Sequence, residues 1–210
     1  RPAGLQEVPD APALLPDPAP RDGDPMRIVI VGGVGGGMSC AARARRLDER
    51  AEILVLERGE HVSVATCGLP YHLGGEVEER ALQVQSPESL RAALDLDVRP
   101  RHEVVGLDTA ARTVAVRTPD GDETIGYDAL VLSPGATAIV PPLPGLADSP
   151  RVRTLRSIAD ATALRGAIAA GARSAVVLGG GFIGLEAAEA LAGRGLDVAV
   201  VELAPHVLPP

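Results

Sequence analysis

Aromatic side chains are nearly absent from this 210-residue sequence. Tyr71, Tyr127 and Phe182 make up 1% of the chain, and there is no tryptophan. Hydrophobic residues still reach 46%, so a core can form, but it has to be built from valine, leucine, isoleucine and alanine. This composition favours buried parallel strands over a β-sandwich.

Positive charge, long apolar runs and cysteine are also scarce. The 20 basic residues are outnumbered by 28 acidic ones, and a net charge of −8 disfavours nucleic-acid binding. No run approaches the ~20 apolar residues of a membrane span, and no signal-peptide pattern opens the chain. Two cysteines cannot form a disulfide framework. The sequence therefore predicts a soluble, cytoplasmic protein that binds neither nucleic acid nor membrane.

A strand–helix–strand unit begins the ordered part of the chain. Residues 1–25 are rich in proline, alanine and aspartate without a period, and we expect a disordered extension there. After Met26, the patterns predict a strand over 27–33 that runs into glycines, a helix over 36–50 and a strand over 51–59. This order is the start of a βαβ unit.

The middle of the chain mixes element types. We expect a helix over 86–96 capped by Ser86 with Ser89, antiparallel strands over 102–128 with a turn at 119–122, and a buried strand over 129–135. The Pro-rich stretch 136–146 predicts a connector. We place a domain boundary there, with one domain over 26–146 and the start of another over 147–210.

The opening pattern then recurs. A helix is expected over 157–171, followed by a second strand–glycine turn–helix–strand over 174–202. The fold class is therefore α/β, with two Rossmann-like units and a small antiparallel insert. Because the second unit would leave strand edges and apolar faces uncovered, we expect the chain to be incomplete at its C-terminus.

The second glycine turn carries a dinucleotide-binding pattern. Gly179 permits a tight turn, Gly181 permits close approach of a pyrophosphate, and Gly184 lets the helix pack on the strand. Glu202 ends the next strand, where a carboxylate accepts from a ribose 2′-hydroxyl and repels a 2′-phosphate. The pattern predicts NADH in preference to NADPH; the alternative is a glycine-rich turn without a ligand.

The first glycine turn departs from this pattern at one position. Gly32 and Gly37 keep their places, but Val34 stands where the middle glycine is expected, and Glu57 ends the following strand. The context still predicts a dinucleotide. Two such sites in series suggest an electron relay, with a flavin in one and a nicotinamide in the other.

The segment SVATCGLPYHLGG, residues 63–75, raises the question of what Cys67 does. The residues alone leave a buried packing role and a reactive thiol equally open; the tail after Cys67 resembles a helix start, which would stabilise a thiolate. Cys40, among alanines, favours packing. His61 and His72 lack metal-ligand spacing, so no metal site is predicted. Arg43, Arg45 and Arg46 favour a solvated helix face.

Several motifs together resemble those of the pyridine nucleotide–disulfide oxidoreductases. They are IVIVGGVGGGMSC, CGLPYHLGG, LSPGA and VVLGGGFIGLEAAEAL, in that order over 26–210, and the coenzyme A-disulfide reductase and persulfide reductase branch is the most similar. The resemblance implies FAD at the first loop and NAD(P)H at the second. It places FAD contacts at Gly32, Gly33, Gly37, Glu57, Ser133, Pro134 and Gly135, and nicotinamide-dinucleotide contacts at Gly179, Gly181, Gly184 and Glu202.

The same resemblance implies that Cys67 is the redox cysteine. The two-cysteine members have a second cysteine where this chain has His72, and the peroxidase and oxidase members have a histidine where it has Gly35. Coenzyme A contacts fall on Ser39, Arg43, Arg46, Ser63 and Thr66. Thr66 replaces the usual asparagine and Val64 the usual phenylalanine. Family members continue into a C-terminal dimer domain, which implies a homodimer for longer homologues.

The resemblance implies a reductase that passes electrons from NADH through FAD to a Cys67–coenzyme A mixed disulfide or a related persulfide. Three alternatives remain. An NADH oxidase would depend on oxygen, a non-catalytic fragment would purify without flavin, and a thiol redox sensor would oxidise Cys67 without consuming NADH.

Overall fold

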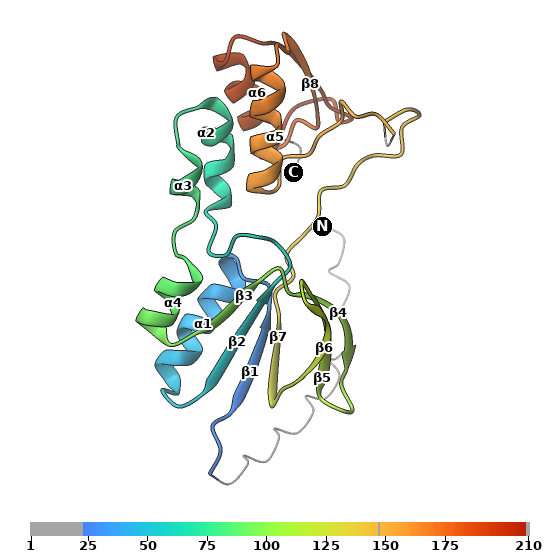
Figure 1. Cartoon of the computed structure of the whole chain (residues 1–210). Helices are drawn as coiled ribbons and strands as arrows, with labels where there is room; N and C mark the ends of the chain where they lie inside the picture. The colour runs from blue at the N-terminus through green and yellow to red at the C-terminus, as the bar shows by residue number, and fades with distance from the viewer. Residues whose placement is uncertain (1–22, 147, 209–210) are drawn as a thin grey trace, which may run out of the picture.

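The computed structural model describes residues 23–146 and 148–208, so most of the expected N-terminal extension lies outside the described residues. Two lobes are visible in Figure 1, joined by several chain segments. The elements of the first lobe are β1 (Arg27–Val31), α1 (Gly35–Leu47), β2 (Glu52–Glu57), α4 (Pro87–Leu94), β3 (Asp97–Pro100), β4 (Glu103–Asp108), β5 (Thr113–Thr118), β6 (Gly121–Gly126) and β7 (Ala129–Leu132).

A four-stranded parallel sheet forms the centre of this lobe. Its strand order is β3-β2-β1-β7, and β1 pairs with β2 from Arg27 opposite Glu52 to Val31 opposite Leu56. The inner strands are apolar over almost their whole length, as strands covered on both faces must be. This confirms the predicted α/β class and the βαβ start.

The two faces of the parallel sheet have different covers. On one face, α1 and α4 bury Ile30, Val55 and Leu90 in one core cluster. On the other face, the antiparallel sheet β4-β5-β6 packs its Val114 and Val116 against the parallel strands in a second cluster. Figure 1 shows the helices and the antiparallel sheet on opposite sides. The predicted antiparallel insert is thus present.

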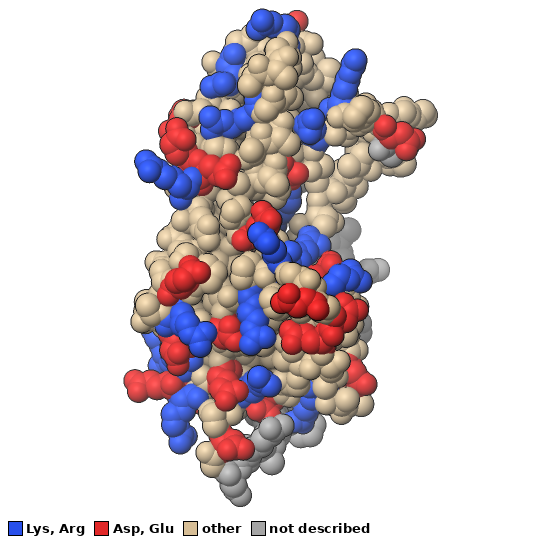
Figure 2. All heavy atoms as spheres, viewed as in Figure 1, with Lys and Arg blue, Asp and Glu red and all other residues tan. Residues whose placement is uncertain are grey.

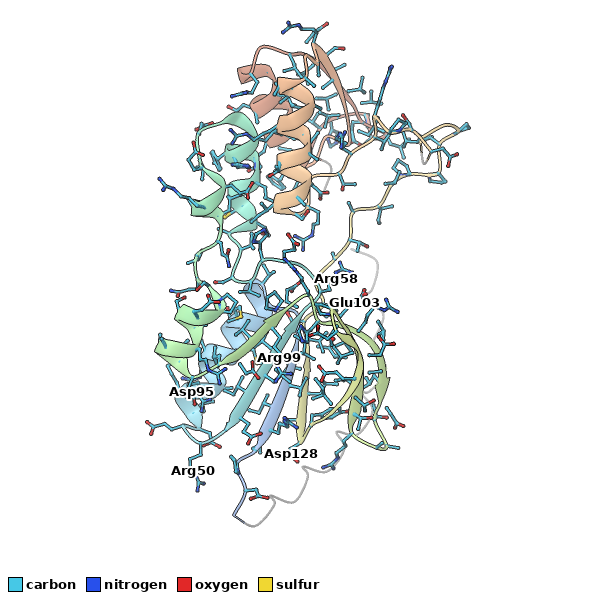
Figure 3. The ribbon with its side chains drawn as sticks, viewed as in Figure 1. Arg50, Arg58, Asp95, Arg99, Glu103 and Asp128 are labelled. Carbon is cyan, nitrogen blue, oxygen red and sulfur yellow. The ribbon has the colours of Figure 1, made fainter. Side chains whose placement is uncertain are left out.

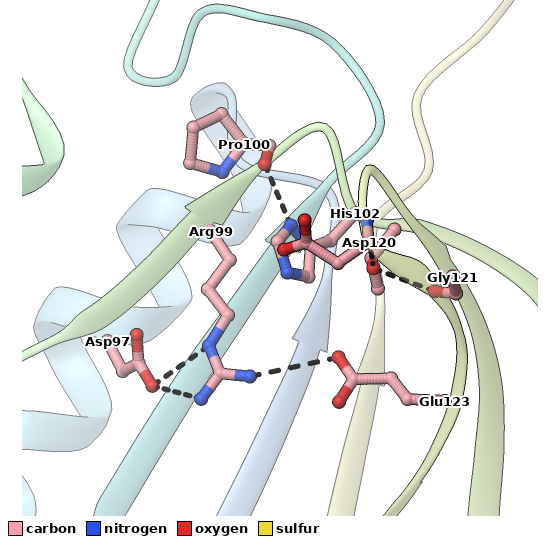
Figure 4. Close-up of polar contacts among 8 residues, drawn as sticks. Asp97, Arg99, Pro100, His102, Asp120, Gly121 and Glu123 are labelled. Carbon is pink, nitrogen blue, oxygen red and sulfur yellow. Dashed lines mark hydrogen bonds and ion pairs between the residues drawn. The ribbon is translucent and has the colours of Figure 1, made fainter.

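Arg99 links the parallel sheet to the antiparallel one. Its Nη2 lies 2.6 Å from a carboxylate oxygen of Asp97, and its Nη1 lies 3.8 Å from a carboxylate oxygen of Glu123 on β6 (Figure 4). The hydrogen bond to Asp97 is the main cause that raises the pKa of Arg99. Figure 3 shows Arg99 near mid-strand, with Arg58 and Glu103 at one end of the sheet and Asp128 at the other.

The second lobe combines two distant parts of the sequence. Its elements are the 3-10 turn Thr66–Gly68, α2 (Leu69–Gly74), α3 (Glu79–Leu82), α5 (Ile158–Ala169), β8 (Ser174–Leu178), α6 (Phe182–Gly193) and β9 (Asp197–Val201). Strands β8 and β9 are parallel, as the predicted second unit requires. Helix α2 packs against α5 and α6, so the chain after Cys67 shares a core with the second unit (Figure 1).

Surface charge is mixed over the face shown in Figure 2, where basic and acidic side chains are interspersed on the first lobe and stretches without charged side chains are larger on the second. The sequence did not predict β3 or α3, and the predicted strand 129–135 is shorter, ending at Leu132. Within the described residues, no helix combines the length and apolarity needed to span a bilayer.

Candidate functional site

Steric crowding accounts for two glycines of the first loop. Gly32 follows β1 with φ +105°, and a Cβ on it would collide with the carbonyl oxygen of Ser133 at the end of β7. Gly37 lies in the first turn of α1, where a Cβ would collide with the carbonyl oxygen of Gly32. Both positions therefore require glycine, and α1 begins close to the ends of β1 and β7.

The second loop repeats this arrangement. Gly179 has φ +104°, and a Cβ on Gly184 would collide with the Gly179 carbonyl oxygen. The middle position differs, because a Cβ on Gly181 would meet nothing within 4 Å. Gly181 precedes α6 as Val34 precedes α1, and both have extended backbones. The valine in the first loop is therefore compatible with the same backbone path.

The helices that follow the two loops begin without side-chain caps. Neither Val34 before α1 nor Gly181 before α6 provides a cap, and neither helix has an acidic residue in its first turn. By contrast, α4 and α5 have complete capping boxes at Ser86 and Ser157. Uncapped N–H groups at a helix N-terminus attract phosphate. The pyrophosphate of a dinucleotide therefore fits both loops.

Glu57 braces the first loop from the end of β2. Its Oε2 accepts from the Gly33 N–H at 2.7 Å, and its Oε1 accepts from the Gly59 N–H at 2.7 Å. The Glu57 carbonyl oxygen accepts from the His102 N–H at 2.9 Å. The Glu57 carboxylate, predicted to contact FAD, is thus held beside the loop by backbone contacts.

Glu202 does the same in the second unit. Its Oε2 accepts from the Gly180 N–H at 2.6 Å and its Oε1 from the Ala204 N–H at 2.8 Å. The bond from Ala204, followed by that from Gly180, lowers the pKa of Glu202 below the ordinary glutamate value. A lowered pKa keeps this carboxylate charged at neutral pH.

The repeat extends further than the sequence indicated. The Ser63 N–H donates to the Gly33 carbonyl oxygen at 2.8 Å, and the Leu208 N–H donates to the Gly180 carbonyl oxygen at 2.8 Å. Ser63 and Leu208 are both left-handed, with φ of 53° and 52°. Non-glycine residues seldom adopt this conformation. No shared residue type marks this match, which is why the sequence did not reveal it.

The strand-end motif that begins at Ser133 lies beside the first loop. The Ser133 N–H donates to the Val31 carbonyl oxygen at 2.8 Å, and its hydroxyl lies 2.6 Å from the position that a Cβ on Gly36 would take. Pro134 comes next, and Gly135 turns the chain with φ +71°. These predicted FAD contacts are therefore adjacent to the loop predicted to hold FAD.

Cys67 lies in the 3-10 turn that leads into α2, and it is exposed. The packing role weighed for it is therefore wrong, whereas Cys40 is partly buried at the edge of the first-lobe core. The residues just before this turn are held by a backbone contact with α3, since the Ala65 N–H donates to the Leu82 carbonyl oxygen at 2.8 Å. Among the described residues, no group of His, Cys, Asp or Glu could hold a metal ion.

His72 is the buried polar residue of α2, with 3% of its surface exposed. Its Nδ1 lies 2.8 Å from the Val77 carbonyl oxygen and 3.0 Å from Nη1 of Arg165, which also lies 3.1 Å from the His72 carbonyl oxygen. A carbonyl can only accept and a guanidinium can only donate, so Nδ1 donates to Val77 in one tautomer of His72 and accepts from Arg165 in the other. The guanidinium donates to the His72 carbonyl oxygen in either case. Arg165 gave no sequence signal.

A groove of about 400 Å³ on the first lobe contains part of the predicted substrate set. It brings together Ser39, Arg46 and Ser63, but Arg43 and Thr66 do not line it. Its lining residues are Met38, Ser39, Ala42, Arg46, Ser63, Gln85, Leu90, Ala93 and Leu94. A lining that combines apolar side chains with an arginine and two serines suits a ligand with both a hydrocarbon and a phosphate part.

Most of this chain is similar to proteins of one known family. The family model described as pyridine nucleotide-disulphide oxidoreductase matches residues 26–210. Coenzyme A disulfide reductase from Staphylococcus haemolyticus is 38% identical over 180 residues, which cover 83% of this chain and 40% of that protein. NADH oxidase from Methanocaldococcus jannaschii is 33% identical over 187 residues, covering 88% of this chain and 42% of that protein.

Solved structures agree with these relatives. Reduced Bacillus anthracis CoADR-RHD superposes with a TM-score of 0.86 at 43% identity, covering 89% of this chain and 34% of that one. The NAD-dependent persulfide reductase from A. fulgidus has a TM-score of 0.85 at 36% identity, covering 88% and 35%. The chain thus spans about 40% of the length of the curated relatives that it matches.

Proposed function

The chain belongs to the pyridine nucleotide-disulphide oxidoreductase family. We propose that it functions in an enzyme that uses NADH and FAD to reduce coenzyme A disulfide or a related persulfide. In this proposal Cys67 is the residue that exchanges with the disulfide. The same proposal includes the domain limits, which are 26–146 and 147–210. It also includes a cytoplasmic location and a homodimer for longer homologues.

One observation carries the proposal: the exposed thiol of Cys67 follows, a few residues later in the sequence, a segment that is hydrogen-bonded to the first glycine loop. Ser63 is bonded to Gly33 of the first loop through its backbone N–H, at 2.8 Å. Its left-handed turn directs the chain into the 3-10 turn that presents Cys67. A thiol that is tied to a nucleotide loop and open to solvent can meet both a cofactor and an external disulfide.

The residues of both loops support the proposed cofactors. FAD would lie on Gly32, Gly33 and Gly37 with Glu57 and the Ser133–Gly135 turn, and NADH on Gly179, Gly181 and Gly184 with Glu202. When bound, these groups supply the electron pair that a disulfide reduction requires. The lowered pKa of Glu202 supports NADH over NADPH, because a charged carboxylate repels a 2′-phosphate.

The chemistry of the chain itself is thiol–disulfide exchange. The Cys67 thiolate attacks one sulfur of the disulfide, a Cys67–substrate disulfide forms, and the other half leaves as a thiolate. A two-electron reduction of this mixed disulfide returns the Cys67 thiolate and releases the second half as a thiol. Arg46, Ser39 and Ser63 would bind the substrate in the groove that they line. Arg43 and Thr66 do not line the groove but belong to the same proposed substrate set.

The visible spectrum of the purified chain tests the cofactor part of the proposal. A flavin spectrum that bleaches on adding NADH under nitrogen is expected, and the colour should return when coenzyme A disulfide is added. Cys67→Ser should abolish the return of colour, whereas the matched Cys40→Ser variant should keep it. Unchanged disulfide-dependent turnover in Cys67→Ser would refute the role of Cys67.

An NADH oxidase is the second candidate, because a relative of that name matches the chain at a comparable level. Gly35 argues against it, since the resemblance places a histidine of the oxidase branch there. Oxygen dependence decides between the two. NADH consumption that needs oxygen, and does not respond to coenzyme A disulfide, would favour the oxidase over the reductase.

A further inference from the structure

The helix after Cys67 is built into the second lobe. Leu73 of α2 is fully buried against Ala187 and Leu191 of α6. Leu69, two residues after Cys67, packs with Ile158 and Ala161 of α5. The position of the thiol therefore depends on α5 and α6, although the groove that would hold its substrate lies on the first lobe.

Polar contacts from α5 fasten the same segment at two places. The Arg165 guanidinium donates to the His72 carbonyl oxygen at 3.1 Å, and the Thr162 hydroxyl donates to a carboxylate oxygen of Glu79 at 2.7 Å. In the tautomer that donates from Nδ1, His72 also ties α2 to the loop after it through the Val77 carbonyl, at 2.8 Å. The two contacts from α5 join residues more than 80 positions apart in the sequence.

Of these two contacts from α5, the one made by Arg165 should contribute more to holding α2. Arg165 is partly buried, and its charged donor meets the His72 carbonyl oxygen, which also accepts the Gly75 N–H at 3.0 Å at the end of the helix. Hydrogen bonds from a charged donor are stronger than neutral ones. The Thr162–Glu79 contact is exposed and so competes with water.

We propose that Arg165 is a positioning residue for Cys67: by holding α2 through His72, it keeps the thiol in register with the substrate groove of the first lobe. This proposal rests on the proposed function, since it assumes that a large disulfide occupies the groove lined by Arg46. Arg165 touches neither substrate nor cofactor in this scheme. Its effect passes through the backbone of α2 to the turn that presents Cys67.

Two thiol reagents of different size test the proposal in a Cys40→Ser background. Coenzyme A disulfide needs both the groove and an aligned thiol, whereas iodoacetamide needs only access. Arg165→Ala should slow formation of the Cys67–coenzyme A disulfide about tenfold, and change alkylation by iodoacetamide by less than about twofold. Mass spectrometry of the intact chain measures both rates. Arg165→Lys keeps a charged donor and should restore part of the loss.

Matched measurements separate positioning from general stability. Arg153→Ala removes an exposed arginine from the segment before α5 and should change neither rate. Backbone hydrogen exchange should rise in 69–77 of Arg165→Ala but not in 87–94. Three results would overturn the positioning role. Arg165→Ala could slow both thiol reactions equally, leave both rates unchanged, or leave backbone hydrogen exchange in 69–77 unchanged. A parent chain whose Cys67 is alkylated yet does not react with coenzyme A disulfide would instead overturn the proposed function, while the exchange result still decides whether Arg165 holds α2.

Discussion

Glu57 and Glu202 perform the same structural task in the two halves of the chain. Glu57 ends β2 and Glu202 directly follows β9. Each carboxylate accepts the N–H of the second glycine of its loop, at 2.7 Å from Gly33 and 2.6 Å from Gly180. The correspondence continues to the left-handed residues Ser63 and Leu208. The two halves are thus duplicates over strand, loop, helix, strand and return segment.

The two halves differ beyond this duplicated part. After Ser63 the chain crosses to the second lobe and presents Cys67 before it enters α2. The redox candidate is therefore an addition to a shared nucleotide-binding frame. In the proposed function, the frame would hold the two cofactors, and the added segment would place the thiol beside them.

Replacing Gly184 tests the packing of helix on strand in the second unit. Gly184→Ala should destabilise the chain by about 1–3 kcal/mol, because the new methyl group collides with the Gly179 carbonyl oxygen. Gly193, in the last turn of the same helix, has no atom within 4 Å of its would-be Cβ. Gly193→Ala should therefore stabilise by about 0.5–1 kcal/mol. Urea unfolding of both variants measures the difference, and equal effects would contradict the steric explanation.

Two neighbouring arginines of α1, Arg45 and Arg46, should differ in what they contribute to stability and to coenzyme A binding. Arg45 donates to the carbonyl oxygens of Leu94 at 2.9 Å, Asp95 at 2.8 Å and Glu49 at 2.6 Å, so it ties the end of α1 to the end of α4. Arg45→Ala should cost about 2 kcal/mol or more in unfolding free energy. Arg46→Ala should change stability by less than about 0.5 kcal/mol.

Coenzyme A binding should show the reverse order, since Arg46 lines the groove and Arg45 does not. Arg46→Ala should weaken binding of coenzyme A about tenfold, through loss of a charged contact with its phosphates. Titration calorimetry at a temperature where all variants are folded provides the measurement. Equal affinities for Arg46→Ala and the parent would remove Arg46 from the substrate set.

Local signals accounted for much of the fold and of the site. Apolar runs next to glycines predicted β1 and β8, and Ser86 with Ser89 predicted the cap of α4, which the structure confirms as a capping box. These features depend on neighbours in the sequence, so pattern and propensity suffice. The exposure of Cys67 contradicts the buried packing role, and its reactivity stays a prediction.

Long-range contacts escaped the sequence. The four-residue strand β3 and the one-turn helix α3 are too short to show a period, and tertiary contacts decide them. The burial of α2 between α5 and α6 depends on two segments about 90 residues apart, and so does the contact of Arg165 with His72. Nothing in the residue types indicates which arginine fastens a distant helix.

The ion pair between Arg99 and Glu123 should contribute little despite its position between two sheets. The two side chains are 35% and 42% exposed and 3.8 Å apart, so water and salt screen the attraction. Arg99→Met should lower the unfolding free energy by about 0.5–1 kcal/mol, and the difference should shrink in about 1 M salt. Urea unfolding at two salt concentrations checks this. A larger, salt-independent loss would show that the side chain acts by packing instead.

Acid should act on the second loop through Glu202. Its pKa is lowered in the folded chain, chiefly by the bond from the Ala204 N–H and then by that from Gly180, so the carboxylate is more acidic folded than unfolded. A group of this kind adds stability above its unfolded pKa and loses it as the pH falls through the folded pKa.

Glu202→Gln should thus be less stable than the parent at neutral pH, and the difference in unfolding free energy should close under acid. Urea unfolding at about pH 7 and about pH 3.5 measures the gap. Glu189→Gln, which replaces an exposed glutamate of α6, is the matched control variant. A gap for Glu202→Gln that stays constant between the two pH values would contradict the role of its charge.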